Sequence, residues 1–280
     1  MSARPAVSQP AIPPRPTAQP VTPAATRSSA IPPRISGVAV VVPARDEAEL
    51  IARCLASIRE ARLLLAGRAA AGGPGAAGQG RDEEVRVVTV VVADDCSDDT
   101  AAIAAAVPDV TVVETRLRSV GAARSEGARV AFARLAEHGV AADAVWLAAT
   151  DADSAVPPAW LTSQLDLADR EGADVVVGTV RPDFADLSDA QVAAWLSRHT
   201  PGRPNGHVHG ANLGLRATVY EAAGGFGELD LHEDVELVAR ARAAGAVVVA
   251  SEAGEVLTSG RQVGRTRGGY AGYLANDLLA

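Results

Sequence analysis

Two carboxylates one residue apart form the sharpest short motif of the sequence, Thr150-Asp151-Ala152-Asp153-Ser154. They directly follow the apolar run at 145–148, which predicts a buried strand. Like charges this close raise each other's pKa and cost stability unless a cation compensates them. Hard oxygen ligands suit Mg²⁺ or Mn²⁺, which also bind substrate phosphates. The motif therefore predicts a divalent ion that joins the two acids to a diphosphate, with an exposed acidic turn as the alternative.

Two further acidic motifs also follow predicted strands. Pro43-Ala44-Arg45-Asp46-Glu47 comes after 38–42, and Asp94-Asp95-Cys96-Ser97-Asp98-Asp99-Thr100 comes after 85–92. Carboxylates at a strand end can accept hydrogen bonds from a ribose or a base. For the first motif the alternative is a turn whose acids favour a helix N-terminus. For the second, Ser97 or Asp98 can cap the helix that follows.

A run near the end gathers three arginines, Arg261, Arg265 and Arg267, in an otherwise acidic chain. Because a guanidinium group matches the geometry of a phosphate, Arg261 and Arg265 are candidate phosphate ligands. A solvated basic loop is the alternative.

The elements that must position these residues alternate between strands and helices. The predicted strands are 38–42, 85–92, 110–113, 145–148 and 175–177. After the first of them, Ile51, Cys54, Leu55 and Ile58 have the spacing of one apolar helix face. Further helices are predicted after Asp98, from about Ser119 to Glu137 and from about Pro158. This order predicts an α/β fold with a mostly parallel central sheet, whose ligands lie beyond the carboxyl ends of its strands.

Composition divides the chain into a tail and one domain. Residues 1–34 are rich in proline and poor in large apolar side chains, so we expect a disordered tail. Residues 67–84 contain a Gly-Gly-Pro-Gly run and are expected to form a flexible loop insertion. The remaining sequence, within 35–280, predicts a single catalytic domain.

Charge and cysteine content argue against nucleic acid as a partner and against an oxidising compartment. A net charge of −8 and a pI near 5.2 do not favour binding to nucleic acid. Two cysteines and the lack of an apolar leader in the first thirty residues favour a reduced, cytoplasmic protein. The longest apolar runs stop far short of a bilayer span, so any membrane contact is expected to be peripheral.

Taken in order, these motifs resemble those of glycosyltransferase family 2. The resemblance continues through Gly121-x-x-Arg124, Gly210-Ala211-Asn212-Leu213, Gly224-Gly225-Phe226 and His232-Glu233-Asp234, and covers about residues 36–270. It implies the GT-A fold, in which a Rossmann-like nucleotide-binding half, here about 35–155, joins an acceptor-binding half, about 156–270. It also implies a nucleoside diphosphate sugar donor and an acceptor hydroxyl that the sequence does not identify. A UDP-sugar is the prior expectation for the donor.

The resemblance also implies roles for individual residues. The pocket for the base and ribose would be lined by Pro43, Ala44, Arg45, Glu47, Asp94 and Asp95. Arg124 would lie near the nucleotide or its phosphates, with a helix-surface position as the alternative. Asp153 would bind the metal directly, and Asp151, beside Ala152, would contact the ribose or the metal through water. The acceptor side would include Gly210, Asn212, His232 and Glu233.

Asp234 would be the catalytic base and would give inversion at the anomeric carbon. A sugar hydroxyl is a weak nucleophile that must lose its proton during attack, whereas the leaving diphosphate needs a cation rather than an acid. One carboxylate and one cation therefore suffice. The alternative for Glu233 and Asp234 is a charge pair at a helix N-terminus, because Val235, Leu237 and Val238 follow with helical spacing.

Other functions would leave other signatures in the sequence. A sugar-1-phosphate nucleotidyltransferase should have a glycine-rich loop where this chain has Pro43–Glu47, and a dinucleotide oxidoreductase fails on the same ground. A non-catalytic nucleotide-sugar-binding or scaffold protein stays open as an alternative. The element Gln262-x-x-Arg265 resembles that of processive members, but Thr266 replaces the expected tryptophan. His207 and His209 are minority candidates for an additional metal ligand, and Trp195 is assigned to packing.

Overall fold

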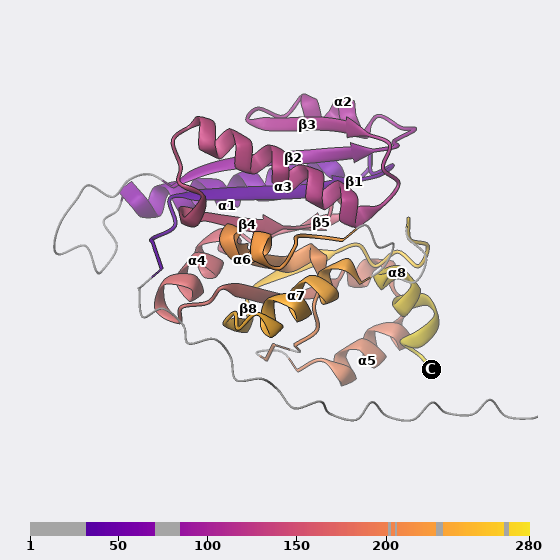
Figure 1. Ribbon diagram of the computed structural model, residues 1–280. Helices are drawn as coiled ribbons and strands as arrows, with labels where there is room; N and C mark the ends of the chain where they lie inside the picture. Colours follow the sequence, from indigo (N-terminus) through magenta and orange to yellow (C-terminus); the bar gives the residue numbers. More distant parts are fainter. Residues whose placement is uncertain (1–31, 71–84, 201–202, 205, 228–231, 266–268) are drawn as a thin grey trace, which may run out of the picture.

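Eight strands of the computed structural model form one mixed sheet with helices on both faces (Figure 1). The structure describes residues 32–70, 85–200, 203–204, 206–227, 232–265 and 269–280. The strands are β1 (Gly37–Ala44), β2 (Arg86–Asp94), β3 (Val110–Thr115), β4 (Val145–Ala149), β5 (Ser154–Ala155), β6 (Val175–Pro182), β7 (Leu213–Arg216) and β8 (Val248–Thr258).

The helices of the described residues lie between these strands and at the C-terminal end. The α-helices are α1 (Ile51–Ala70), α2 (Thr100–Ala105), α3 (Val120–Glu137), α4 (Trp160–Arg170), α5 (Asp189–Arg198), α6 (Ala217–Ala222), α7 (Glu233–Ala243) and α8 (Tyr270–Gly272). Short turns of 3₁₀ or π type are η1 (Ala142–Ala144), η2 (Phe184–Asp186), η3 (Gly210–Asn212) and η4 (Tyr273–Asp277).

The strand order is β3-β2-β1-β4-β7-β6-β8-β5. β1 to β4 pair in parallel, as do β6 and β8, whereas β7 is antiparallel to both of its neighbours. The carboxyl ends of β1, β2 and β4 therefore meet at one edge of the sheet. Pairing continues one residue past β4, because the Thr150 amide donates to the Val41 carbonyl at 3.2 Å. Asp151 is thereby placed beside the end of β1.

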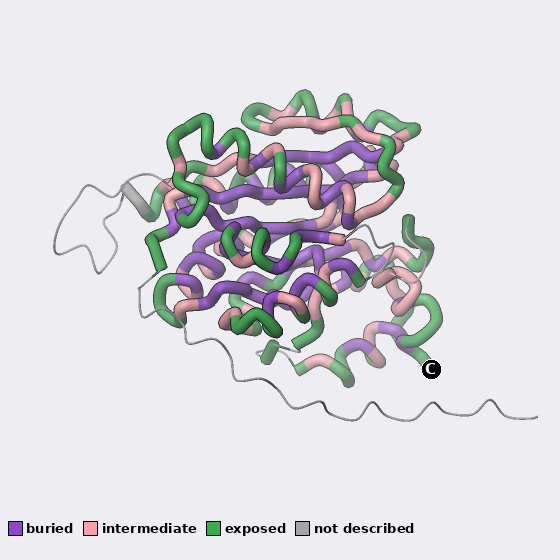
Figure 2. The backbone as a smooth tube through the Cα atoms, in the orientation of Figure 1, coloured by how far each residue is buried: buried purple, intermediate pink, exposed green. Residues whose placement is uncertain are grey.

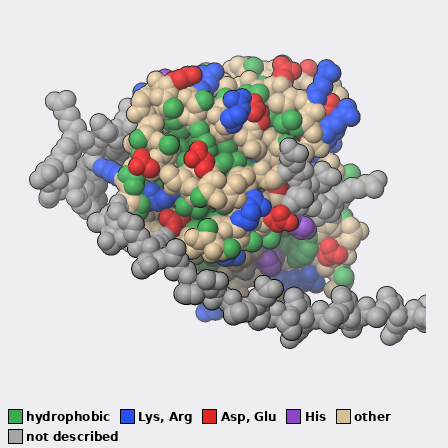
Figure 3. Space-filling model, viewed as in Figure 1, with side chains coloured by type: hydrophobic (Ala, Val, Ile, Leu, Met, Phe, Trp, Pro, Cys, Tyr) green, Lys and Arg blue, Asp and Glu red, His purple; other side chains and the backbone are tan. Residues whose placement is uncertain are grey.

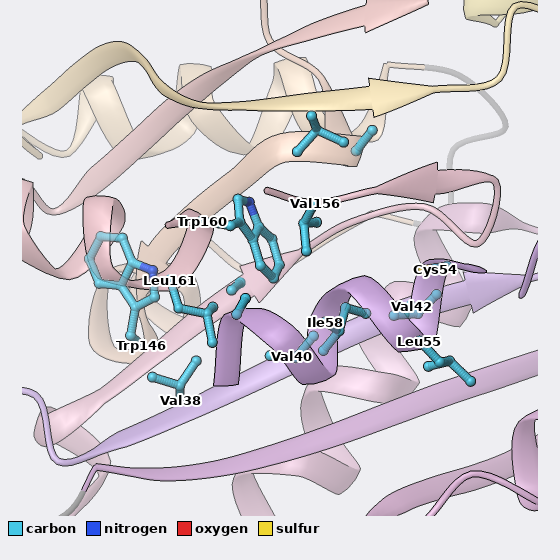
Figure 4. Close-up of a cluster of buried hydrophobic side chains, with 14 of the residues drawn as sticks. Val38, Val40, Val42, Cys54, Leu55, Ile58, Trp146, Val156, Trp160 and Leu161 are labelled. Atoms are coloured by element: carbon cyan, nitrogen blue, oxygen red, sulfur yellow. The ribbon is translucent and has the colours of Figure 1, made fainter. Parts of the chain in front are cut away.

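The core is divided into two layers by the sheet. Alternate residues of a strand point to opposite faces, so Val38, Val40 and Val42 pack with α1 and α4, whereas Ala39 and Val41 pack with α3, α6 and α7. Figure 4 shows the first layer, where Ile58 of α1 lies near Val40 of β1 and Trp160 lies beside Val156. The buried strands lie in the middle of the molecule and the exposed segments surround them (Figure 2).

The predicted elements agree well with the structure. All five predicted strands are present, and the α1 residues expected to form an apolar face, Ile51, Cys54, Leu55 and Ile58, are each at most 2% exposed. The helix predicted from about Ser119 to Glu137 is α3, and Ser119 caps it through its side-chain oxygen. β5, β7 and β8 and the helices α5 and α6 had no predicted counterpart.

One boundary of the predicted loop insertion is corrected. α1 continues to Ala70, so residues 67–70 are helical, because the apolar face of the helix extends through Ala61 to Leu65. The rest of the insertion, 71–84, and nearly all of the predicted tail, 1–31, lie outside the described residues.

Acidic and arginine side chains lie interspersed on the face of the molecule shown in Figure 3. Among the described helices, none combines the length and the apolar character needed to cross a bilayer.

Candidate active site

A cavity of about 1130 Å³ lies at the edge of the sheet where β1, β2 and β4 end. It brings together every site residue predicted from the sequence except Asp95 and Asn212. These residues are Pro43, Ala44, Arg45, Glu47, Asp94, Arg124, Asp151, Ala152, Asp153, Gly210, His232, Glu233, Asp234, Arg261 and Arg265. They come from segments spread over more than two hundred residues of sequence, so the fold assembles one site from separate motifs.

The paired acids after β4 are each bound by an arginine. Arg124 donates a hydrogen bond to Asp151, and Arg261 Nη2 lies 2.8 Å from Asp153 Oδ2. Burial, followed by the neighbouring charge of Asp151, raises the pKa of Asp153 to about 6 despite this guanidinium. The repulsion expected from the sequence is therefore present, and arginines offset only part of it.

Arg124 connects the two acidic motifs of the site. It lies on α3 with its side chain 4% exposed and donates to both Asp151 and Glu233. A helix-surface position, the alternative considered from the sequence, is thus excluded. Gly210 leaves room for this guanidinium group, because a Cβ there would lie 2.4 Å from Arg124 Cζ and would force the guanidinium to move from its two acids. Arg124 holds the end of β4 and the start of α7 in one ionic network.

Asp234 is fixed in the first turn of α7 at the cavity wall. Its Oδ2 accepts a hydrogen bond from the Gly210 amide at 2.6 Å, and its Oδ1 accepts one from the Val235 amide at 2.7 Å. His232, just before the helix, has a left-handed backbone with φ of 65°. Negative side chains stabilise the N-terminal end of a helix. Glu233 and Asp234 therefore stabilise the start of α7 and also line the cavity.

Glu47 binds arginine side chains of the C-terminal segment. Its carboxylate accepts two hydrogen bonds from Arg261, at 2.6 and 2.8 Å, and Arg265 Nε lies 3.7 Å away. Arg265 also donates to the Asp46 carbonyl at 2.5 Å. The resemblance placed Glu47 in the pocket for the base and ribose. In the structure the Glu47 carboxylate lines the cavity and is joined to Asp153 through their shared partner Arg261.

The acids after β2 lie at another part of the site. Asp94 accepts hydrogen bonds from the Leu117 amide at 2.6 Å and from Thr115 Oγ1 at 2.9 Å. Asp95, outside the cavity lining, pairs with Arg118 at 2.8 Å and with Arg45 at 3.2 Å, and the Arg118 hydrogen bond lowers its pKa. Arg118 was not predicted from the sequence as a site residue. It could have been found, because Arg118 follows the third predicted strand in the same way as the other site residues follow their strands.

Aromatic and imidazole rings line the part of the cavity near η3 and α8. His209 lies 6.3 Å from His207 and 5.7 Å from Tyr270 between ring centroids, and Tyr270 stacks near Tyr273 at 5.9 Å. Burial lowers the pKa of His209 to about 4, so this ring is neutral near pH 7. Trp195 packs behind them, as expected, and donates to the Tyr270 hydroxyl at 3.1 Å. The tyrosines follow no predicted strand, so the sequence offered no signal for them.

No histidine belongs to a potential metal cluster within the part of the chain that the structure describes. The cluster of three or more metal-ligating side chains found there consists of Asp46, Cys96 and Asp98. Asp46 and Asp98 instead accept backbone hydrogen bonds, from Ser97 and from Ala48 and Thr100. These acids therefore serve the turn before α2. The N-cap of α2 is Asp99 rather than Ser97 or Asp98, although Asp98 accepts the amide of the first helical residue, Thr100.

Asn212 is a structural residue of the site rather than part of its lining. Its side chain is buried, donates to the carbonyls of Thr179 and Gly254 at 2.8 Å each, and accepts from Trp160 Nε1 at 2.9 Å. It thereby joins β6, β8 and the start of α4 to η3, whose Gly210 amide binds Asp234.

We predict that Asn212→Ala lowers the free energy of unfolding by about 2 kcal/mol or more, because it leaves three buried polar groups without partners. Urea unfolding of the variant beside the wild type measures this. Asn276→Ala removes an exposed asparagine and is the matched control. An equal effect of the two substitutions would contradict the role of Asn212.

The comparisons with known proteins agree with this geometry. The glycosyl transferase family 2 pattern matches residues 39–211, which is more than half of the chain. The chain belongs to glycosyltransferase family 2. The match begins in β1 and ends in η3, so it includes the motifs after β1, β2 and β4 and stops short of α7. The comparison with curated proteins gave no match.

Solved structures of glycosyltransferases share the family 2 fold seen here. TarS residues 1–349 of S. aureus are 14% identical with a TM-score of 0.53, over 81% of this chain and 61% of that one. The same TarS segment in complex with UDP-GlcNAc is 15% identical with a TM-score of 0.54, over 84% and 62%. Mannosyltransferase PcManGT from Pyrobaculum calidifontis, in complex with GDP-Man and Mn²⁺, is 22% identical with a TM-score of 0.50, over 85% and 59%. The fold is therefore GT-A, and the chain spans about three-fifths of these proteins.

Proposed function

We propose that this protein transfers a glycosyl group from a nucleoside diphosphate sugar to an acceptor hydroxyl, with inversion and with the help of a divalent metal ion. The observation that carries the proposal is the cavity that holds Asp151 and Asp153 together with Asp234 and Arg265. The first pair supplies metal-binding oxygens, and the second supplies a base and a phosphate ligand. Family membership and the glycosyltransferase neighbours support glycosyl transfer from a nucleotide sugar, and the Mn²⁺ in the PcManGT complex supports a role for a divalent ion.

The residues present fit a divalent ion. Asp151 and Asp153 offer hard oxygen ligands on the cavity wall. Burial, followed by the neighbouring charge of Asp151, raises the pKa of Asp153 although Arg261 lowers it, so a further cation beside this carboxylate would stabilise its charged form. We infer that Asp153 would hold the ion directly and Asp151 directly or through water. When bound, the ion would neutralise charge that gathers on the leaving diphosphate.

The chain's own groups account for the remaining steps. Asp234 would accept the proton of the attacking hydroxyl, from a position fixed by the Gly210 amide. Arg265 and Arg261 would bind the donor phosphates. Asp94, Arg45 and Arg118 would line the nucleoside end. A single displacement by an acceptor on the Asp234 side would invert the anomeric carbon.

The donor and acceptor are proposed at the level of chemical class. The TarS complex contains UDP-GlcNAc and the PcManGT complex contains GDP-Man, so both bases belong in the first screen, and a UDP-sugar stays the prior choice. The acceptor would enter along the side lined by His207, His209 and Tyr270.

A thermal-shift panel of UDP-, GDP- and dTDP-sugars, with and without Mn²⁺ or Mg²⁺, tests the proposal. We predict that at least one donor with metal raises Tm by about 5 °C at roughly a hundred times its Kd, because ligand binding stabilises the folded state by mass action. The same donor with EDTA should have a much smaller effect. If no donor gives a metal-dependent shift, the scaffold alternative is favoured instead.

A further inference from the structure

Arg261 lies between two carboxylates of the site, Glu47 and Asp153. Its guanidinium donates two hydrogen bonds to Glu47 and also lies 2.8 Å from Asp153 Oδ2. We propose that Arg261 is a built-in counter-ion that competes with the metal for Asp153, and that Glu47 is the positioning residue that keeps Arg261 in the site after it leaves Asp153. The inference rests on the proposed function, because it concerns the same metal and diphosphate.

The carboxylates of Glu47, Asp151 and Asp153 need compensating positive charge even when no ligand is bound. Glu47 is 5% exposed and the Asp153 side chain is 14% exposed, so an unpaired charge on either would be costly. Arg261 serves both acids, and Arg124 serves Asp151. The site can therefore fold with its acids close together and without a metal.

The contacts of Arg261 are unequal, and this inequality gives the exchange its direction. Both Glu47 oxygens bind Arg261, whereas Asp153 contributes only Oδ2. Asp153 can therefore release Arg261 while the bidentate pair with Glu47 persists. The freed guanidinium face would then lie next to the metal ligand, where the donor diphosphate must bind.

Glu47 is well placed to act as a fixed anchor. Its amide donates to the buried Thr100 Oγ1 at 2.7 Å, and its carbonyl accepts from the Leu50 and Ile51 amides at 3.0 and 2.9 Å. These bonds tie the residue to α2 and to the first turn of α1. The anchor thus belongs to the nucleotide-binding half, while Arg261 comes from the segment that follows β8.

Competition by Arg261 makes metal and nucleotide binding cooperative. Without nucleotide, the metal must displace Arg261 from Asp153. With nucleotide, the phosphates offer Arg261 a new partner and the displacement costs less. By thermodynamic reciprocity, the nucleotide must strengthen metal binding by the same factor as the metal strengthens nucleotide binding.

The test is a titration of the full chain with Mn²⁺, in which the electron paramagnetic resonance signal measures the concentration of free Mn²⁺. The titration is done without nucleotide, with UDP and with GDP. In Arg261→Ala, we expect Mn²⁺ affinity without nucleotide to rise about tenfold, the size of one charged hydrogen bond, and the enhancement by nucleotide to fall. Arg261→Gln keeps most of the side chain but removes its charge. It should also raise the Mn²⁺ affinity without nucleotide and lower the enhancement by nucleotide. Circular dichroism of each variant checks its folding.

Arg265→Ala is the matched control, because it removes the same charge from the same segment, and the contacts of Arg265 are with Glu47 and the Asp46 carbonyl rather than with Asp153. It should weaken nucleotide binding and leave Mn²⁺ affinity without nucleotide nearly unchanged. The proposal is overturned if Arg261→Ala leaves that affinity unchanged or weaker, or if Arg265→Ala raises it equally. The titration without nucleotide needs no sugar donor, so it gives a result even if the proposed transferase function fails.

A double-mutant cycle tests the role of Glu47. Glu47→Gln should weaken Mn²⁺ binding about tenfold in the wild-type background, because Arg261 then has Asp153 as its one remaining carboxylate among the described residues. In the Arg261→Ala background the effect should shrink. Equal effects in both backgrounds would mean that Glu47 acts through its own charge and would refute its positioning role.

Discussion

Replacement of Asp234 by asparagine is expected to lower kcat about a thousandfold, the usual contribution of a positioned general base. The amide oxygen of the Asp234→Asn variant can still accept the Gly210 hydrogen bond. The second bond, from the exposed Val235 amide, is lost, and that amide can bond to water, so the local structure should largely persist. It cannot take the proton of the attacking hydroxyl. Donor affinity with metal should change by no more than about twofold, because the lost group acts on the acceptor.

Slow hydrolysis of the donor gives a measurement that needs no known acceptor, because water then takes the place of the hydroxyl. Release of the nucleoside diphosphate measures the rate, and calorimetry measures donor binding. Glu236→Gln is the matched control, since it removes an exposed acid from the same turn of α7, where it pairs with Arg240 at 3.6 Å. If the Asp234→Asn enzyme keeps more than about a tenth of the wild-type rate, the base lies elsewhere.

Residues that follow the ends of parallel strands could be assigned to one site from the sequence, and they line the same cavity in the structure. Pro43 to Glu47, Asp94 and the pair at 151 and 153 follow strands that turned out to be parallel neighbours in the sheet. Backbone turns at Asp46 and Asp95, with φ of 51° and 54°, direct the chain away from the sheet at these positions. Local patterns sufficed because each strand and the residues after it are contiguous in sequence.

The partners of these residues could not be predicted in the same way. Glu47 and Arg261 are 214 positions apart, and Arg124 and Glu233 are 109 apart. Nothing in the spacing of either pair indicates contact, because the contact depends on how α3, α7 and the segment after β8 pack. The resemblance to the family gave Arg124 and Glu47 approximate positions, but not the acids and arginines that they bind.

The antiparallel strand β7 shows a second limit. Its four residues, Leu213–Arg216, are too few to display a periodic pattern, yet β7 lies between β4 and β6 in the centre of the sheet. Asn212 immediately precedes it, and its family motif suggested a role on the acceptor side. In the structure its side chain is buried, and three hydrogen bonds join it to β6, to β8 and to Trp160 of α4.

The ionic network around Arg124 should also dominate the stability of the site. Arg124 and Glu233 are both almost fully buried, whereas Asp151 is partly exposed, and removal of Arg124 leaves the buried charge of Glu233 uncompensated. Arg124→Ala is therefore expected to lower the free energy of unfolding by about 3–5 kcal/mol near neutral pH. Arg129→Ala removes an exposed arginine from the same helix, paired with Glu126 at 2.6 Å, and should have little effect.

The loss in Arg124→Ala should depend on pH, because burial raises the pKa of Glu233 and Arg124 opposes that rise. A carboxyl with a raised pKa binds a proton more readily in the folded state, so its contribution favours folding at low pH and weakens as pH rises. Without Arg124 the pKa of Glu233 in the folded state rises further. The loss of unfolding free energy relative to the wild type should therefore be smaller at about pH 5 than at about pH 7.5. Urea unfolding of both proteins at the two pH values measures the difference. A loss that is the same at both would show that the buried charge of Glu233 is not its cause, and that Arg124 stabilises the fold through packing against neighbours such as Phe226.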